Sequence, residues 1–420
     1  MRWQSEIQCS SERERADRQI EISARSRSLL LAISLLLSGI GLAWSATVEL
    51  QTRTNWVFKA DGIRISNQFP GARVNGCERI GEHRYRLLIK AENTPINRSP
   101  WYAFKIRSQQ PREVDVVLRY HNATHRYHPK VSTNGVDWDN LNGVRWQLSQ
   151  HRTQATLTLA VDRHPLWVAG QERIGVKQLR SWMKQISERP GVTRRRIGKS
   201  LGERGIPGIR FGSETATNFV IIVSRQHPPE VTGTVGMMAF IEKLLDDSDN
   251  SIAFRGAHAV LLVPMMNPDG IIEGHWRHNL AGVDLNRDWK DFNQPETRCV
   301  RDWIERSLQR RSGRPLLFLD FHSTYHNIFY TQKDEHPTVP ADFTKNWLAA
   351  CRQRLPHAVL RRSASHNLEK PTSKAWAYDR FGCPAITYEF GDEFDRTEIR
   401  KQATVAAEEM MKLLQDFVAR

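Results

Sequence analysis

Cysteines and long hydrophobic runs are both scarce in this sequence. Five cysteines in 420 residues are too few for a fold held by a disulfide framework, and none has the CxxC spacing of a zinc or redox motif. The longest apolar run is shorter than the roughly 20 residues that a membrane span needs. Because 40% of the residues are hydrophobic and 25% are charged, the composition indicates a globular protein. It excludes a disordered, collagen-like or multi-span membrane chain.

The apolar run, Leu29–Trp44, follows Arg25 and Arg27 and leads into the small residue Ser45. A positive flank, a short apolar core and a small-residue exit are typical of a secretory signal peptide, here with cleavage after Ser45. An uncleaved membrane anchor is the alternative. We therefore expect residues 1–46 to be an N-terminal tail with a signal peptide or membrane anchor, and the protein to be exported, periplasmic or extracellular. In an oxidising compartment the remaining cysteines could form one or two disulfides.

Residues 47–170 have the pattern of a β-rich domain. Runs at residues 84–90, 101–107, 114–120 and 154–161 are rich in strand formers, and most of them alternate apolar with polar side chains. Turn-forming pairs such as Asn134-Gly135 separate these runs. The pattern predicts an antiparallel β-sandwich over residues 47–170.

After residue 170 the pattern changes to continuous apolar runs separated by helical periodicity. The apolar spacing over residues 176–188 predicts a helix that ends before Pro190. Apolar runs typical of buried strands then occur at residues 218–223, 257–265, 316–321 and 385–390. Strands that alternate with helices predict an α/β domain over residues 176–420, with a mixed, mostly parallel sheet flanked by helices.

Side chains that can bind metal or transfer protons lie where these apolar runs end. His227 and Glu230 follow the first run, His322 follows the third, and Glu389 ends the fourth. Because ligands bind at the carboxyl ends of strands in such sheets, we expect these side chains to converge. Two histidines and a glutamate are the three protein ligands of a catalytic zinc that keeps one position open to water. A lone HxxE pair is also explained by a His–Glu hydrogen bond at the surface, and a lone histidine by burial in the core. The zinc hypothesis therefore depends on the agreement among side chains at separate strand ends.

Several short stretches together resemble one known family. They are RQHPPE at 225–230, NPDG at 267–270, AGVDLNR at 281–287, DFH at 320–322 and TYE at 387–389, with Arg277 between the second and the third. In this order they resemble the zinc metallocarboxypeptidases of the carboxypeptidase A type, and most of all their cytosolic carboxypeptidase branch. The resemblance covers about residues 176–420. The β-rich region, with STNGVDW at 132–138, is similar to the small sandwich that precedes the catalytic domain in that branch.

The resemblance implies one zinc ion per chain, held by His227, Glu230 and His322. It also implies that Glu389 is the general base, which takes a proton from the attacking water and returns it to the leaving amine. Zinc would lower the pKa of that water to about 7 and polarise the substrate carbonyl. A strand-end carboxylate paired with an arginine is the alternative interpretation of Glu389 taken alone.

Four further residues would contact the substrate. Asn286 and Arg287 resemble the pair that binds the terminal carboxylate, a task that suits the arginine fork. Arg277 resembles the arginine that stabilises the oxyanion. Lys374 falls where the cytosolic branch has a basic residue that receives an acidic side chain, so we expect a preference for C-terminal Glu or Asp. A solvated lysine is the alternative.

The sequence also departs from the family pattern. Pro229 stands where the family often has glycine or another small or polar residue, a change that should not remove a ligand. The family's mobile substrate-binding tyrosine has three candidates here, namely Tyr325, Tyr378 and Tyr388, and none aligns convincingly.

Two other features of the sequence suggest rival functions. GKSLG at 198–202 fits the GxSxG motif of serine hydrolases, but the flanking sequence predicts neither the strand before it nor the helix after it. The formal net charge of +15 suggests nucleic acid binding. However, the basic clusters at 194–196 and 310–311 lack interleaved aromatics, and no nucleic-acid-binding module is recognisable. We interpret the basic excess as a solvated face and expect no nucleic acid partner.

These observations predict an exported zinc-dependent metallocarboxypeptidase that hydrolyses the C-terminal peptide bond of peptides or proteins and favours acidic C-terminal residues. Cell-wall stem peptides, cleaved by a carboxypeptidase or amidase activity, are an alternative substrate. An inactive carboxypeptidase-like binding module is an alternative of a different class, but it should have lost a ligand or the base, and all are present. Because the predicted signal directs the chain out of the cytosol, the tubulin trimming known in the cytosolic branch does not transfer.

Overall fold

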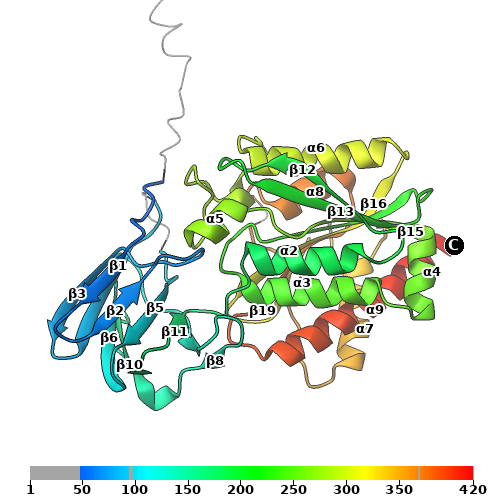
Figure 1. Cartoon of the computed structure of the whole chain (residues 1–420). Helices are drawn as coiled ribbons and strands as arrows, with labels where there is room; N and C mark the ends of the chain where they lie inside the picture. The colour runs from blue at the N-terminus through cyan, green and yellow to red at the C-terminus, as the bar shows by residue number, and fades with distance from the viewer. Residues whose placement is uncertain (1–47, 94–97, 368, 420) are drawn as a thin grey trace, which may run out of the picture. The chain divides into compact units, whose positions relative to one another are not determined.

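The computed structural model describes residues 48–93, 98–367 and 369–419 (Figure 1), hereafter the described residues. Residues Thr47–Arg420 form one compact unit, and the division of this unit near residue 170 stays a prediction. Leu29–Trp44 lies outside the described residues, so the signal peptide or anchor also stays a prediction. Among the helices that are described, none is both long and apolar enough to span a membrane.

Two facing sheets are built from residues 55–169. One sheet consists, in spatial order, of β1 (Asn55–Phe58), β2 (Ile63–Ser66), β5 (Ala103–Ser108), β11 (Leu166–Ala169), β7 (Lys130–Ser132) and β8 (Asp139–Asn140). The other consists of β3 (Gly76–Gly81), β4 (Arg84–Ile89), β6 (Arg112–Tyr120), β10 (Gln154–Val161) and β9 (Trp146–Leu148). Neighbouring strands are antiparallel except β4 and β6, which are parallel.

Alternating side chains fill the space between these two sheets. In β10, Ala155, Leu157, Leu159 and Val161 are buried, whereas the residues between them are exposed or half-buried. They share a core with side chains of the other sheet such as Phe104. The sandwich that the period-two runs predicted is therefore confirmed, and we refer to residues 48–169 as the sandwich.

The remainder of the chain is built on one mixed sheet. In spatial order its described strands are β12 (Thr193–Lys199), β13 (Gly205–Gly212), β15 (His258–Val263), β14 (Asn218–Ser224), β16 (Arg314–Thr324), β19 (Ala385–Gly391), β17 (Ile328–Tyr330) and β18 (Arg361–Ser363). The central strands β15, β14, β16 and β19 are parallel neighbours, and so are β17 and β18. The other pairs are antiparallel. The predicted mixed, mostly parallel sheet is confirmed.

Helices cover both faces of this sheet. The core on one face includes side chains of α2 (Val176–Ser187), α3 (Val231–Leu244), α4 (Asp249–Ala257), α7 (Phe343–Arg354) and α9 (Arg396–Ala419). The core on the other face includes side chains of α6 (Pro295–Gln309) and α8 (Ser373–Phe381). Along β14, Val220 and Ile222 belong to the first core, and Phe219 and Ile221 belong to the second. Burial on both faces explains why this strand is a continuous apolar run.

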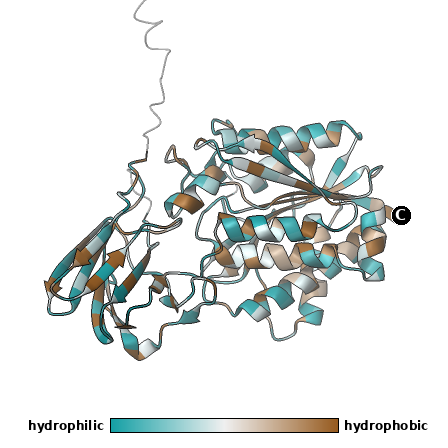
Figure 2. Ribbon diagram, viewed as in Figure 1, coloured by the Kyte–Doolittle hydropathy of each residue, from teal (hydrophilic) through white to brown (hydrophobic). Residues whose placement is uncertain are grey.

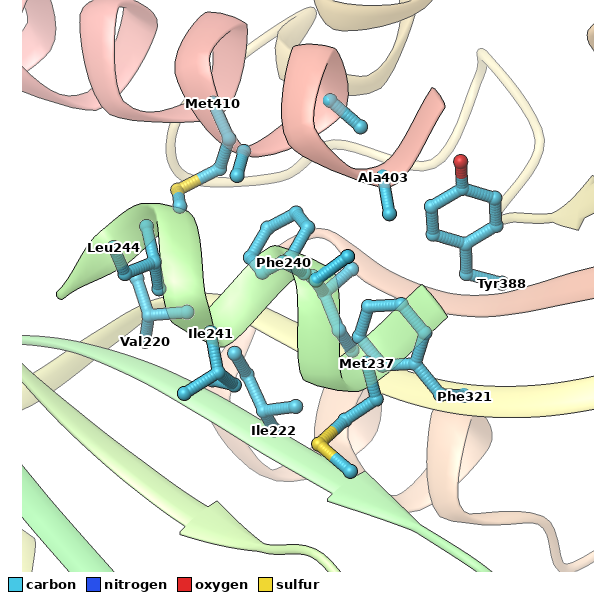
Figure 3. Packing of buried hydrophobic residues seen from close by; sticks show 14 of the residues in the cluster. Val220, Ile222, Met237, Phe240, Ile241, Leu244, Phe321, Tyr388, Ala403 and Met410 are labelled. Atoms are coloured by element: carbon cyan, nitrogen blue, oxygen red, sulfur yellow. The ribbon is translucent and has the colours of Figure 1, made fainter. Parts of the chain in front are cut away.

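The helix α3 shows how the first core is packed. Its apolar side chains recur three and four positions apart and point toward the sheet on one side and toward α9 on the other (Figure 3). The residues labelled on α3 are Met237, Phe240, Ile241 and Leu244. Hydrophobic residues concentrate along the central strands, whereas α6 alternates hydrophobic with hydrophilic residues (Figure 2). This is the pattern expected of a buried sheet under amphipathic helices.

The hairpin formed by β12 and β13 was not predicted. A strand does precede Ser200, so the prediction that none does was wrong: β12 includes Gly198 and Lys199. The next element is β13 rather than a helix, and the Ser200 hydroxyl donates to Asp269 Oδ1 at 2.8 Å. The GxSxG match therefore still lacks the helix that a serine hydrolase requires.

The described cysteines form no disulfide. Cys77, Cys299, Cys351 and Cys383 are all free thiols. Burial raises the pKa of each thiol to about 12, so these cysteines are poor nucleophiles. The disulfides considered from the sequence are therefore not formed in this structure.

The remaining short elements connect these larger ones. They are α5 (Pro268–Glu273) and the two 3-10 turns η1 (Gly143–Arg145) and η2 (Leu285–Arg287). Asn267 caps α5, since its side-chain oxygen accepts from Gly270 N at 2.9 Å. Asp284 caps η2 by accepting from Asn286 N at 2.9 Å. The loop between α5 and η2 carries Arg277, and η2 itself carries Asn286 and Arg287.

Candidate active site

The parallel strands β14, β16 and β19 bring the predicted metal ligands and the predicted base together. His227 and Glu230 lie on the turn between β14 and α3. His322 lies inside β16, which continues to Thr324, beyond the end that its apolar run suggested. Its register partner on β19 is Glu389. The convergence expected from three strand ends is therefore observed.

His227, Glu230 and His322 form a tight cluster. Glu230 Oε1 lies 2.8 Å from His227 Nδ1, and Glu230 Oε2 lies 2.7 Å from His322 Nδ1. The ligand atoms of the three side chains lie within 4.8 Å of one another, close enough to bind one metal ion. Both imidazoles therefore turn Nδ1 toward the shared carboxylate.

Each imidazole also contacts a second carboxylate through its other ring nitrogen, Nε2. His227 Nε2 is 2.9 Å from Asp284 Oδ1, and His322 Nε2 is 2.8 Å from Asp320 Oδ2. A carboxylate on the outer nitrogen fixes the tautomer and orientation of a metal-binding histidine. Two such pairs around one glutamate fit a zinc ion well. Both aspartates lie inside the recognised motifs, but the motifs alone did not indicate a role for them.

The surroundings shift the pKa values of Glu230 and Glu389 in opposite directions. Burial alone would raise the pKa of Glu230, but the two flanking imidazoles outweigh it and hold this pKa well below its usual range. For Glu389, burial and then the nearby Glu230 carboxylate raise the pKa to about 7. Its Oε2 atom is buried and accepts no hydrogen bond from the described residues. Glu389 is thus a poorly solvated carboxyl group whose pKa suits proton transfer near neutral pH.

Arg277 is anchored beside the cluster by Asp284. Its Nε donates to Asp284 Oδ2 at 2.7 Å, while Oδ1 of the same carboxylate faces His227. Burial lowers the pKa of Arg277, but the pairing with Asp284 more than offsets this and raises it. Both Nη groups lack a hydrogen-bond partner among the described residues. They are therefore available for a ligand.

Asn286 and Arg287 follow on η2. Asn286 is buried, and its Nδ2 lies 3.4 Å from His322 Nε2. Its Oδ1 accepts from Ser373 N, at the start of α8, at 3.0 Å. Burial lowers the pKa of Arg287, and its Nη1 donates to the Asn286 carbonyl at 2.6 Å. The structure therefore brings this pair next to the His227, Glu230 and His322 cluster, and its role in binding the substrate carboxylate stays a prediction.

Lys374 is the most buried of the predicted substrate contacts. It is 2% exposed, and burial lowers its pKa to about 8. Its Nζ donates to the His366 carbonyl at 3.0 Å and forms no ion pair within the described ranges. Burial is the main cause that lowers the pKa of His366, and the charges of Lys374 and Arg287 lower it further. The three side chains therefore lie near one another. A solvated surface lysine does not fit this environment.

The three tyrosine candidates occupy different environments. Tyr325, in the loop between β16 and β17, is 64% exposed. Tyr388 is buried among aromatic rings, 4.1 Å from the ring centroid of Phe329. The hydroxyl of Tyr378 donates to the Pro337 carbonyl at 3.3 Å. Tyr325 is the most exposed of the three candidates.

The sandwich also reaches this region, a contact that the sequence did not predict. Arg126 Nη2 lies 2.6 Å from Asp392 Oδ2, just after β19. Its guanidinium lies 4.5 Å from the ring centroid of Tyr325. Arg126 also lowers the pKa of Glu389, although less than burial and Glu230 raise it. No local pattern marks Arg126, because its ion-pair partner Asp392 lies 266 positions away in the sequence.

Comparison of the sequence with known proteins gives one consistent result. The sequence model of the zinc carboxypeptidase family matches residues 179–411. The chain is 32% identical over 310 residues to cytosolic carboxypeptidase 2 of Danio rerio, which covers 64% of this chain and 42% of that protein. It is 21% identical over 347 residues to cytosolic carboxypeptidase 6 of Caenorhabditis elegans, which covers 75% of this chain and 72% of that protein. The chain thus spans less than half the length of the Danio rerio relative.

Solved structures share the fold. A metallo-carboxypeptidase from Burkholderia cenocepacia superposes with a TM-score of 0.69 at 17% identity, over 85% of this chain and 100% of that chain. A metallo-carboxypeptidase from Pseudomonas aeruginosa superposes with a TM-score of 0.67 at 19% identity, over 84% of this chain and 99% of that chain. At these identities the likeness concerns the fold alone, and it extends over the sandwich as well as the α/β part.

Proposed function

The chain belongs to the zinc carboxypeptidase family, and from this membership and the site geometry we propose that it hydrolyses the C-terminal peptide bond of peptides or proteins. One observation carries the proposal. The His227, Glu230 and His322 cluster, which fits a zinc ion, adjoins a buried carboxyl oxygen of Glu389 that has no hydrogen-bond partner in the described part of the chain. Metal ligands beside a group able to transfer protons are what a metal-dependent hydrolase needs.

Each residue of the site would have a separate role in peptide hydrolysis. A zinc ion held by His227, Glu230 and His322 would supply Lewis-acid polarisation of the carbonyl and acidify water. Glu389, with a pKa raised to about 7, would accept a proton from the attacking water. It would then donate that proton to the departing amine. The Nη groups of Arg277 would donate hydrogen bonds to the carbonyl oxygen as negative charge develops on it.

Two cations would hold the last residue of the substrate. Arg287, assisted by the Asn286 amide, would bind the terminal carboxylate in bidentate fashion. Lys374, a buried cation without an ion-pair partner among the described residues, would bind an acidic side chain. Since an uncompensated buried charge is costly, a substrate carboxylate at this position would be favoured over an apolar group. C-terminal Glu and Asp are therefore the proposed preferred residues.

The test uses the purified chain and short peptides that differ only in their last residue. Release of that residue, followed by mass spectrometry, should stop after chelation and return with Zn²⁺. Glu389→Gln should lower kcat by about 10²–10⁴-fold, as expected for loss of a general acid–base group. Glu305→Gln is the matched control, since Glu305 pairs with Arg380 on the exposed side of α6. Full activity after complete metal removal, or in Glu389→Gln, would contradict the proposal.

The same preparation separates the alternatives. A binding module would bind peptides without releasing a residue, with or without zinc. A cell-wall enzyme would cleave stem-peptide fragments faster than linear peptides in a competition digest. Export is a further proposal that rests on Leu29–Trp44 alone. Cell fractionation with N-terminal sequencing tests it, and an intact N-terminus in the cytosolic fraction would refute it.

A further inference from the structure

The loop that carries Arg277 is held by a residue of the sandwich. This loop runs from His275 to Asp284, between α5 and η2. Glu92, three residues after β4 ends, points a carboxylate oxygen at its backbone. Glu92 Oε1 accepts from Arg277 N at 2.8 Å, and from Trp276 N and His278 N at 3.2 Å each. Three consecutive backbone N–H groups therefore converge on one oxygen, an arrangement that binds anions.

Glu92 is well suited to remain an anion in this position. Its side chain is fully buried, and its Oε1 also lies 2.9 Å from His278 Nδ1. Its second oxygen lies 3.7 Å from Nη2 of the equally buried Arg73. Burial raises the pKa of Glu92, but the hydrogen bond from His278 and the nearby His275 and Arg73 outweigh it and lower this pKa. A buried carboxylate that loses these donors would be strongly destabilised.

Arg277 is consequently fixed at both ends. Glu92 holds its backbone, and Asp284 holds its guanidinium through Nε. The neighbouring Asn93 adds a second link, because its Nδ2 donates to the Gly282 carbonyl at 2.9 Å near the far end of the same loop. Asp284, at the end of this loop, also contacts His227. A shift of the loop backbone would therefore change the position of Arg277 relative to the proposed metal ligands.

We propose that Glu92 is a positioning residue that sets Arg277 for stabilisation of the developing oxyanion, so that the sandwich forms a functional part of the catalytic centre. The inference rests on the proposed function for the role of Arg277. Glu92 does not itself contact the substrate in this scheme. Its effect on the reaction passes entirely through the loop that it holds.

The scheme predicts a specific pattern in kinetics. Arg277 acts where charge develops, so its displacement should lower kcat and leave KM within about twofold. Loss of an oxyanion donor in other enzymes lowers kcat about 10²–10³-fold, which is the fall expected for Arg277→Ala. Glu92→Gln, which keeps one acceptor oxygen but loses the charge, should lower kcat by about tenfold or more, because small misplacements of this kind are costly.

A double-mutant cycle tests the proposal on the purified full chain loaded with zinc. Because Glu92 acts through Arg277, the Glu92→Gln change should have almost no further effect on kcat in an Arg277→Ala background. Asp61→Asn is the matched control, since Asp61 is another buried carboxylate of the sandwich and binds Arg79 and Tyr85 instead of the loop. Asp61→Asn should lower the thermal midpoint and leave kcat unchanged.

Each outcome bears on the proposal. Equal effects of Glu92→Gln with and without Arg277, or an equal loss of kcat in Asp61→Asn, would overturn it. Full activity of Arg277→Ala would instead refute the oxyanion role in the proposed function. If Glu92→Gln does not fold, Asn93→Ala takes its place in the same cycle. Independence of Asn93→Ala from Arg277 would then count against the proposal.

Discussion

The positive charge of Lys374 should determine how strongly the protein prefers an acidic C-terminal residue. This lysine is 2% exposed, its pKa is lowered to about 8 by burial, and within the described ranges its Nζ donates only to the His366 carbonyl. It lies beside Ser373, whose backbone N–H holds Asn286, and it shares the neighbourhood of Arg287. A C-terminal glutamate would therefore place one carboxylate on each of two neighbouring cations.

The pKa of Lys374 determines how the preference for a C-terminal Glu over Gln should vary with pH. With a pKa of about 8 in the free enzyme, Lys374 is about 90% protonated at pH 7 and about 10% protonated at pH 9. Only the protonated form attracts an acidic side chain. The ratio of kcat/KM for a C-terminal Glu peptide to that for its Gln counterpart should thus fall about tenfold between pH 7 and pH 9. The kcat/KM ratio is the proper measure, because it reports the pKa values of the free enzyme.

Removal of the Lys374 charge by mutation should change the same Glu-to-Gln ratio of kcat/KM by an amount that can be estimated. A hydrogen bond to a charged group contributes about 1.5–3 kcal/mol, which corresponds to about 10- to 150-fold in the same ratio. Lys374→Met should therefore abolish the preference for Glu over Gln and make the ratio independent of pH. Turnover of the Gln peptide should change little, since Lys374 does not contact the reacting bond in this scheme.

The assay compares the two peptides in one mixture, so that errors in enzyme concentration cancel. Lys370→Met is the matched control, because Lys370 lies nearby in the sequence and is exposed. A preference for Glu that persists in Lys374→Met, or that does not weaken toward pH 9 in the unaltered chain, would refute the assignment of Lys374 to the pocket.

Three further predictions concern the metal, the terminal carboxylate and the core. Asp320→Asn should weaken zinc binding about 10- to 100-fold, as loss of an outer carboxylate partner does, and competition with a chelator measures this directly; an unchanged affinity would rule out that role. Arg287→Met should lower kcat/KM by about 10- to 150-fold on peptides with a free C-terminus, and an unchanged value would exclude it from carboxylate binding. Phe240→Ala, which removes a fully buried ring of α3 (Figure 3), should lower the free energy of unfolding by about 3–5 kcal/mol in urea titrations. A loss below about 1 kcal/mol would mean that this core is loosely packed.

The sequence was informative where a strand is buried on both faces. The segments that became β14, β15, β16 and β19 are continuous apolar runs, because helices cover the sheet on both sides. The ends of such strands meet at one edge of the sheet. This topological rule, together with the order of the motifs, was sufficient to predict that His227, Glu230, His322 and Glu389 lie near one another.

The sequence was least informative where pairing depends on tertiary context. β12 contains Arg194, Arg195 and Arg196, all exposed, and a charged run of this kind carries no alternating pattern. It becomes a strand because its backbone pairs with β13 at the end of the sheet. Charged side chains are common on such outer strands, where they oppose unwanted pairing. Propensity and periodicity could not predict this hairpin.

By itself, the sequence determined the fold class and the family and singled out the proposed site residues, since these depend on local pattern and on the order of motifs along the chain. The tertiary structure alone decided what surrounds those residues. It placed Asp284 and Asp320 behind the imidazoles, buried Lys374 without an ion-pair partner among the described residues, and set Glu92 against the backbone of Arg277. These contacts join residues up to 185 positions apart. Because burial and charge act through space rather than along the chain, they become visible only after folding.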